Sequence, residues 1–309
     1  MRKISLPGVV GRFAPSPTGP LHFGSLVAAV GSYCLARQAA GRWLLRIEDL
    51  DAPRVVAGAA DGIMRDLESL GLTWDGEVVW QSRRTEAYAE ALARLQEQGL
   101  VYACGCSRRE ILASAPHPGE DGPVYPGTCR EGLPPGRQPR AERLRVPAAL
   151  VTFQDGLRGH QEQRLADAVG DFILRRADGL FAYQLAAVVD DAAAGVNQVV
   201  RGADLLASTP RQIYLHSCLG YSLPRYIHLP LALGGDGEKL SKRHGASLSA
   251  GSASGGELLA LVLAFLGHPP PSDLVHAPPR ELLAWGVANF SLDRVPVAAS
   301  TPGGIPGWC

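Results

Sequence analysis

The 309-residue sequence lacks an excess of charge of either sign, because 30 Lys and Arg residues balance 30 Asp and Glu residues. A neutral chain has no bulk attraction for nucleic acid or for an anionic membrane, so local patches must meet any polyanion. Long apolar runs are also missing, and the opening segment MRKISLPGVV is too short and too broken by proline for a signal peptide. We therefore expect a cytoplasmic enzyme or binding protein with no membrane partner.

The six cysteines are too few and too unevenly spaced for a disulfide framework in a chain of this length. Cys34 and Cys218 lie in apolar helical patterns and are expected to be buried. The segment that is rich in Pro, Gly and charge is bracketed by Cys104, Cys106 and Cys129. A structural zinc ion needs four ligands, commonly thiolates, and could organise such a polar segment. Chemistry alone favours His117 as the fourth ligand and leaves Tyr125 as an alternative; reduced cysteines in a loop are the other interpretation.

Strand-like and helix-like segments alternate along much of the chain. Strands are predicted at 9–13, 43–47 and 101–103, and helices at 26–37, 61–70, 85–98, 209–219, 257–266 and 280–285. This alternation predicts an α/β fold with a mostly parallel sheet, and the Asp178-Gly179 pair predicts a tight turn between two strands. We expect a catalytic core in two parts (1–103 and 141–250), an insertion at 104–140 and a short helical appendage at 251–309.

The segment RFAPSPTGPLHFGSL, from Arg12 to Leu26, is a rigid loop that leads into a predicted helix. Its prolines fix φ, and its glycines permit close approaches that a β-carbon would forbid. Because unpaired N–H groups point outward at a helix N-terminus, this loop is a natural anion site. His22 lies at its mouth, either as a structural cap or as a contact to a ligand.

A second polar loop, KLSKR at 239–243, is by itself most simply an exposed basic turn. Paired with His22-Phe-Gly24-Ser25, however, it resembles the HIGH and KMSKS signatures of class I aminoacyl-tRNA synthetases. The resemblance implies that both loops bind ATP, with Mg²⁺, and that His22 and Lys242 stabilise the charge that develops on the phosphoryl oxygens. The implied ATP-binding residues are His22, Gly24, Ser25, Lys239, Ser241 and Lys242.

Four further segments, RFAPSPTGPLHFGS, LLRIEDLD, DGLFAYQLAAVVDD and VVRGADLLASTPRQ, resemble the catalytic core of glutamyl-tRNA synthetases. This implies a Rossmann-like class I fold and an L-glutamate pocket lined by Arg12, Phe13, Ala14, Pro15, Ser16, Glu48, Tyr183 and Arg201. Two arginines suit the two carboxylates of glutamate, and Glu48 can accept from its ammonium group. Alternatively, Glu48 lies at a solvent-exposed strand end, and Tyr183 is a core aromatic residue whose hydroxyl reaches solvent.

The cysteine pattern, Cys-x-Cys followed by Tyr-x-x-x-Cys, resembles the zinc site of short paralogues of glutamyl-tRNA synthetase. That resemblance implies one structural Zn²⁺ held by Cys104, Cys106, Tyr125 and Cys129. It favours the tyrosine over His117, which chemistry alone had favoured.

The region after KLSKR is too short for the helical anticodon-binding region of glutamyl-tRNA synthetases. In this short C-terminal region and in the segment RGADLLASTPRQ, the chain resembles the glutamyl-queuosine tRNA(Asp) synthetase family. The resemblance implies activation of glutamate by ATP without tRNA, then esterification of the queuosine base in the anticodon loop of tRNA(Asp). We expect a monomer whose arginines could contact RNA phosphates or could be ordinary surface charge; the candidates are Arg137, Arg140, Arg143 and Arg145. Two alternatives remain: a truncated glutamyl-tRNA synthetase and a non-catalytic, zinc-bearing RNA-binding paralogue.

Overall fold

A parallel sheet forms the centre of the first half of the chain in this computed structural model, which describes residues 8–115, 118–119, 122–234 and 254–299. Strands β1 (Val10–Phe13), β2 (Arg42–Ile47) and β3 (Val79–Trp80) pair in that order, all parallel. A second parallel pair, β11 (Gln198–Gly202) and β12 (Arg225–Leu229), lies next to β1. The strands predicted near residues 9–13 and 43–47 and their parallel pairing are therefore confirmed.

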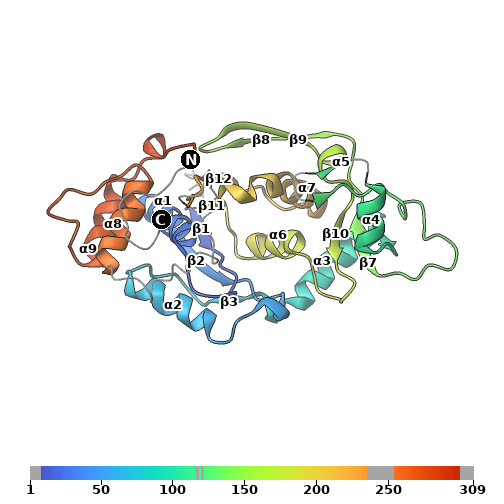
Figure 1. Ribbon diagram of the computed structural model, residues 1–309, viewed down its shortest axis with the longest axis horizontal. Coiled ribbons are helices and arrows are strands. Elements are labelled where there is room, and N and C mark those ends of the chain that lie inside the picture. The colour runs from blue at the N-terminus through green and yellow to red at the C-terminus, as the bar shows by residue number, and fades with distance from the viewer. Residues whose placement is uncertain (1–7, 116–117, 120–121, 235–253, 300–309) are drawn as a thin grey trace, which may run out of the picture.

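Four helices surround this sheet and share its hydrophobic core (Figure 1). They are α1 (Phe23–Gln38), α2 (Ala59–Ser69), α8 (Gly255–Phe265) and α9 (Pro279–Asn289). The ring of Phe23 meets that of Phe265 edge to face, with centroids 5.5 Å apart. The two C-terminal helices thus pack on the first helix of the chain, which is fully buried along much of one face.

A separate sheet is antiparallel, with its strands in the order β10-β7-β4. Its strands are β4 (Val101–Cys104), β7 (Ala141–Leu144) and β10 (Phe172–Arg175), and it packs with α3 (Thr85–Glu97), α6 (Tyr183–Ala193) and α7 (Thr209–Leu219). The prediction of a mostly parallel sheet is wrong for these strands. The chain reaches β7 from β4 through the polar insertion rather than through a crossover helix, so nothing forces a parallel return.

The turn predicted at Asp178-Gly179 is present, with Gly179 at φ 84°, but only one strand flanks it. After the turn, Phe181 makes a single antiparallel bridge to Arg175, and α6 begins at Tyr183. The second predicted strand is therefore reduced to this single bridge, because Ala182 is already the N-cap of α6.

The remaining elements are short, apart from one hairpin. The insertion contains α4 (Arg108–Ser114), β5 (Pro118–Gly119) and β6 (Gly122–Pro123). Strands β8 (Leu150–Asp155) and β9 (Gly159–Arg164) form an antiparallel hairpin that runs along one edge of the molecule to α5 (Leu165–Ala168), as Figure 1 shows. The single-turn helices are η1 (Ala52–Arg54), η2 (Gln81–Arg83), η3 (Ala203–Ser208) and η6 (Leu292–Arg294).

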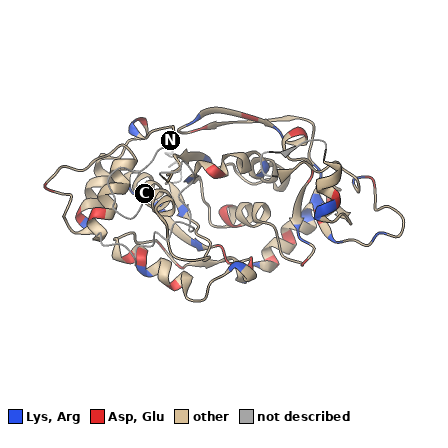
Figure 2. Cartoon of the chain, in the orientation of Figure 1, with Lys and Arg blue, Asp and Glu red and all other residues tan. Residues whose placement is uncertain are grey.

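Acidic and basic residues are scattered over the whole molecule in Figure 2, in keeping with the zero net charge. Within the described ranges, no helix is both long enough and apolar enough to cross a bilayer. The charge that matters for ligands is therefore local charge, and part of it is buried in the centre of the fold.

Candidate active site

A cavity of about 440 Å³ opens where the loop after β1, the start of α1, the end of β2 and the end of β11 meet. Its walls include every described residue that the sequence assigned to ATP or glutamate. These are Arg12, Phe13, Ala14, Pro15, Ser16, His22, Gly24, Ser25, Glu48, Tyr183 and Arg201. Segments far apart in the sequence are thus brought to one pocket. The predicted residues Lys239, Ser241 and Lys242 lie outside the described residues.

His22 is the N-cap of α1, where its Nδ1 accepts the backbone N–H of Ser25 at 3.2 Å. The capping interpretation of His22 is therefore confirmed, and its role in catalysis stays a prediction. Because Nδ1 accepts, a neutral His22 carries its proton on Nε2, which is then a hydrogen-bond donor. His22 can therefore cap the helix and line the cavity at once, because the capping bond uses only Nδ1.

Arg12 is buried, and its Nε donates to Asp191 Oδ1 at 3.3 Å. Asp191 also accepts from Nη1 of Arg46, which in turn donates through Nη2 to Glu48 Oε1 at 3.1 Å. Burial alone would raise the pKa of Asp191, but the two guanidinium groups hold it at about 2. Burial raises the pKa of Glu48, and Arg46 and Arg12 oppose that rise only in part.

Asp190, the neighbour of Asp191 on α6, is also buried and fully engaged. Its carboxylate accepts from Gln81 Nε2 at 2.8 Å, from Tyr88 Oη at 2.7 Å and from Arg84 Nε. The Asp190-Asp191 pair therefore joins α6 to β2 on one side and to η2 and α3 on the other. Pairing of this kind offsets the desolvation cost of the buried charges.

Arg201 also lines the cavity and is 4% exposed. Its Nη1 donates to Tyr183 Oη at 3.4 Å, and its Nη2 donates to Thr209 Oγ1 at 2.8 Å. Its Nε donates to Nε2 of His228 at 3.2 Å, and Nδ1 of His228 lies 2.6 Å from Asp155 Oδ2. The structure thus brings together Tyr183 and Arg201, both of which the resemblance assigned to the glutamate pocket.

The sequence analysis did not identify Arg46, Asp190, Asp191 or His228. A signal for them existed: each is a charged or titratable residue at an inward position of an apolar pattern, in WLLRI, AAVVDD and RYIHL. A polar residue in such a pattern must find a buried partner. The identity of that partner depends on the tertiary structure, so the pattern alone does not supply it.

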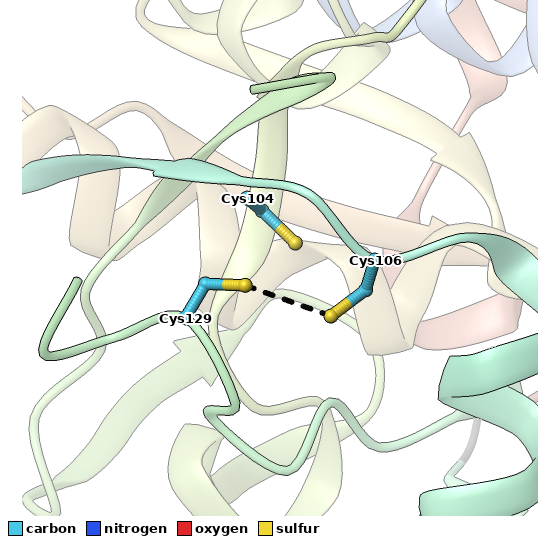
Figure 3. A group of neighbouring side chains, drawn as sticks. All are labelled: Cys104, Cys106 and Cys129. Atoms are coloured by element: carbon cyan, nitrogen blue, oxygen red, sulfur yellow. Dashed lines mark hydrogen bonds between the residues drawn. The ribbon is translucent and has the colours of Figure 1, made fainter. Parts of the chain in front are cut away.

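Three cysteine side chains converge at the end of β4 (Figure 3). The Sγ atoms of Cys104, Cys106 and Cys129 all lie within 4.8 Å of one another, and those of Cys106 and Cys129 are 3.6 Å apart. The hydroxyl oxygen of Tyr125 lies 3.4 Å from Cys104 Sγ and 3.7 Å from Cys106 Sγ. All four residues that the resemblance assigned to zinc are therefore together, whereas His117 lies outside the described residues.

The four arginines suggested as RNA contacts have different environments. The prediction is wrong for Arg143, which is buried, covers the ring of Tyr125 with its guanidinium carbon 3.8 Å from the centroid, and donates to the Asp171 carbonyl. Arg137 pairs with Glu110 at 2.8 Å, and Arg145 pairs with Glu131 at 3.5 Å. Arg140 is exposed.

The fold and the cavity define a class I tRNA synthetase. The family model described as "tRNA synthetases class I (E and Q), catalytic domain" matches residues 8–266. A solved glutamate tRNA ligase from Elizabethkingia meningosepticum, in complex with its amino acid, superposes with a TM-score of 0.80 at 26% identity, covering 96% of this chain and 67% of that one. A glutamate-tRNA synthetase from Elizabethkingia anophelis gives a TM-score of 0.77 at 25% identity, with 96% and 68% covered.

Curated relatives are similar over nearly their whole length. One from Geobacter sulfurreducens is 57% identical over 300 residues, which are 95% of this chain and 96% of the relative. One from Dechloromonas aromatica is 58% identical over 287 residues, covering 93% and 95%. Both are named Glutamyl-Q tRNA(Asp) synthetase. The chain therefore belongs to the glutamyl-Q tRNA(Asp) synthetase family of class I tRNA synthetases, and it is a ligase.

Proposed function

We propose that this ligase activates L-glutamate with ATP to glutamyl-adenylate without needing tRNA, and then transfers the glutamate to the queuosine base in the anticodon loop of tRNA(Asp). One observation carries the first half: a single cavity joins buried guanidinium groups to the N-terminus of α1. The name shared by relatives that are 57% and 58% identical supports the second half.

Glutamate binds between the two buried arginines in this proposal. Arg12 and Arg201 take its carboxylates, Tyr183 donates its hydroxyl, and the backbone and side chains of Phe13 to Ser16 line the rest of the pocket. Glu48 accepts from the ammonium group. Burial raises the pKa of Glu48 although Arg46 is its neighbour, so an arriving ammonium group would further stabilise the charged carboxylate.

ATP binds at the start of α1, with His22, Gly24 and Ser25 on one side of the phosphates and Lys239, Ser241 and Lys242 on the other. Mg²⁺ bound with ATP neutralises phosphate charge. Attack of the glutamate carboxylate on the α-phosphorus forms the acyl–phosphate bond and breaks the bond to pyrophosphate, so negative charge grows on oxygens that these groups can reach. Catalysis then consists of positioning and electrostatic stabilisation, without a protein nucleophile.

In the second step a hydroxyl of the queuosine cyclopentenediol attacks the acyl carbon of the adenylate, so that the ester bond forms, the acyl–phosphate bond breaks and AMP leaves. We propose a catalytic core made of residues 1–103 and 141–250, interrupted by a zinc-bearing insertion at 104–140 and followed by a helical appendage at 251–309. Of the arginines suggested as phosphate contacts, exposed Arg140 fits best, since Arg143 is buried and Arg137 and Arg145 already have acidic partners.

Activation without tRNA is the direct test of the first half. Purified protein given glutamate, ATP, Mg²⁺ and labelled pyrophosphate should form labelled ATP in the absence of any tRNA. Glutamine in place of glutamate should give far less exchange, because a pocket that supplies a cation for each carboxylate loses an ion pair when one becomes an amide. Exchange that appears only after tRNA is added would contradict this half of the proposal.

The four converging side chains fit a tetrahedral zinc ion. Zn–S bonds of about 2.3 Å place two sulfur ligands about 3.8 Å apart, and a Zn–O bond of about 2.0 Å places the oxygen about 3.5 Å from each sulfur. The observed separations are 3.6 Å between Cys106 and Cys129, and 3.4 Å and 3.7 Å from Tyr125 Oη to Cys104 and Cys106. We therefore propose one structural Zn²⁺ held by Cys104, Cys106, Tyr125 and Cys129.

Replacing one ligand should release this metal. We expect one zinc per wild-type chain by elemental analysis, and Cys129→Ser should lose most of it together with protease resistance of the insertion. Cys218→Ser, which changes a thiol that packs against a different hydrophobic core cluster, is the matched control and should keep its zinc. Full zinc in Tyr125→Phe together with loss of zinc in His117→Ala would show that the fourth ligand is the histidine.

A further inference from the structure

The cavity holds two buried arginines whose electrostatic partners differ. Arg12 forms an ion pair with Asp191, whereas no carboxylate within the described ranges forms an ion pair with Arg201. The contacts of Arg201 with other described residues are to neutral groups: the hydroxyls of Tyr183 and Thr209, the carbonyl of Leu205, a ring nitrogen of His228 and the face of the Tyr226 ring. A buried cation without a counter-ion is costly, so this guanidinium is poised for an anionic ligand.

His228 determines how Arg201 is held. The Nε–H of Arg201 can only donate, so the His228 Nε2 at 3.2 Å must accept and cannot carry a proton. Nδ1 is then the protonated nitrogen, and it donates to Asp155 Oδ2 at 2.6 Å. The imidazole is therefore neutral and in one tautomer, and it separates the carboxylate of Asp155 from the guanidinium.

Further contacts fix the imidazole in place. Its side chain is fully buried, and its ring stacks on that of Tyr226, with centroids 6.3 Å apart and an interplanar angle of 12°. The backbone N–H of His228 donates to Asp155 Oδ1 at 3.3 Å. Asp155 ends β8 and also accepts from the backbone N–H groups of Leu157 and Arg158, so the hairpin turn holds the carboxylate rigidly.

We propose that His228 is a positioning residue of the glutamate site: as a neutral Nδ1–H imidazole it orients Arg201 and keeps the Asp155 charge from neutralising it, so that Arg201 can pair with a carboxylate of glutamate. This proposal depends on the proposed function only for the identity of the ligand, glutamate. His228 is not among the residues that line the cavity, so it acts through Arg201 and touches no substrate.

The surroundings of His228 keep it neutral. Burial lowers its pKa, and the positive charges of Arg201 on β11 and Arg158 in the hairpin turn lower it further, against the opposing effect of Asp155 on β8. The hydroxyl of Thr209 on α7 faces Nε2 at 3.0 Å and carries no charge. Protonation at low pH would turn Nε2 into a donor facing the Arg201 donor, so Arg201 should lose its orientation as the pH falls below the usual range of histidine.

Two substitutions separate orientation from simple stability. His228→Leu removes the acceptor and should raise the KM for glutamate about tenfold or more in pyrophosphate exchange, because hydrogen bonds to charged groups are strong, while the KM for ATP stays unchanged. His228→Gln retains an acceptor that cannot be protonated. It should keep the KM for glutamate within a few-fold of wild type and abolish the rise in that KM that wild type shows at acid pH.

His268→Gln is the matched control, because His268 is also fully buried and hydrogen-bonded through both ring nitrogens, to the Leu266 carbonyl and to the Ser291 N–H. It should lower stability without changing either KM. Equal rises in the KM for glutamate in the His228→Leu and His268→Gln proteins would overturn the proposal, as would an unchanged KM in His228→Leu.

A spectroscopic measurement decides the tautomer independently of activity. In protein labelled with ¹⁵N-histidine, the NMR signals that are missing from His228→Gln belong to His228. At pH 7 these signals should show a protonated Nδ1 and an unprotonated Nε2. An imidazolium or an Nε2–H tautomer would overturn the proposal even if the variants behave as expected. Wild-type protein that exchanges no pyrophosphate with glutamate would refute the proposed function, and the ¹⁵N signals would still decide the state of His228.

Discussion

Lys242→Ala is expected to lower glutamate-dependent pyrophosphate exchange about a hundredfold or more while leaving glutamate binding nearly unchanged. A lysine that contacts phosphate acts mainly on the charge that develops in the transition state, and losing one preorganised donor typically has an effect of this size. Glutamate binding measured by calorimetry should keep its affinity, because the proposed glutamate contacts come from β1 and the loop after it, the end of β2, the start of α6 and β11.

The lysine content of the chain allows a second, independent test. The sequence has only three lysines, Lys3, Lys239 and Lys242. ATP with Mg²⁺ should protect Lys239 and Lys242, but not Lys3, from an amine-reactive label mapped by mass spectrometry. Lys3→Ala is the control and should exchange pyrophosphate normally. If exchange is unchanged in Lys242→Ala and ATP protects neither loop lysine, the KLSKR segment has no part in the mechanism.

Asp191→Asn is expected to destabilise the fold by about 3–5 kcal/mol, because it leaves two buried guanidinium groups without their shared counter-ion. Arg12 loses its carboxylate partner, and Arg46 retains Glu48 and the more distant Asp190. Urea unfolding of the wild type and the variant measures the difference. Since Arg12 also lines the cavity, glutamate-dependent exchange should fall with stability.

The control for this prediction is Asp51→Asn, which removes ion pairs with Arg54 and Arg176 at the surface and should change stability by less than about 0.5 kcal/mol. The pH dependence gives a further check. Because the folded-state pKa of Asp191 is about 2, below the unfolded value, its contribution is present above about pH 4 and is lost as the pH falls toward 2. Equal stability of Asp191→Asn and wild type at pH 7 would show that the buried network does not hold the two arginines.

Much of the cavity could be predicted because its residues lie in short contiguous segments. The Arg12–Ser25 loop combines proline, glycine and a helix start within a few residues, so local chemistry fixes its conformation. Helix α7 begins and ends where the sequence predicted, at Thr209 and Leu219, since Pro210 and Gly220 mark its two ends. The family resemblance then connected Arg12, Glu48, Tyr183 and Arg201, which no local pattern could do.

The parts that were missed depend on contacts between distant segments. The antiparallel pairing of β4 with β7 places Val101 opposite Leu144. The order of strands and helices in the sequence does not show in which direction a strand runs in its sheet. Arg143 looked like a surface charge because its neighbours in the sequence are charged, yet it covers Tyr125 in the interior. The partner of His228, Asp155, lies 73 positions earlier, on a strand of the hairpin.

The central claim is that this synthetase acts on the anticodon loop. The most direct measurement gives the protein labelled glutamate, ATP and Mg²⁺, with tRNA(Asp) that contains or lacks queuosine and with tRNA(Glu), and then maps the label after nuclease digestion. We expect an alkali-labile ester in the anticodon fragment of queuosine-containing tRNA(Asp) and no label on tRNA that lacks queuosine. Label on the 3′-terminal adenosine of tRNA(Glu) would contradict the account and would identify the chain as a synthetase that charges the tRNA 3′ end.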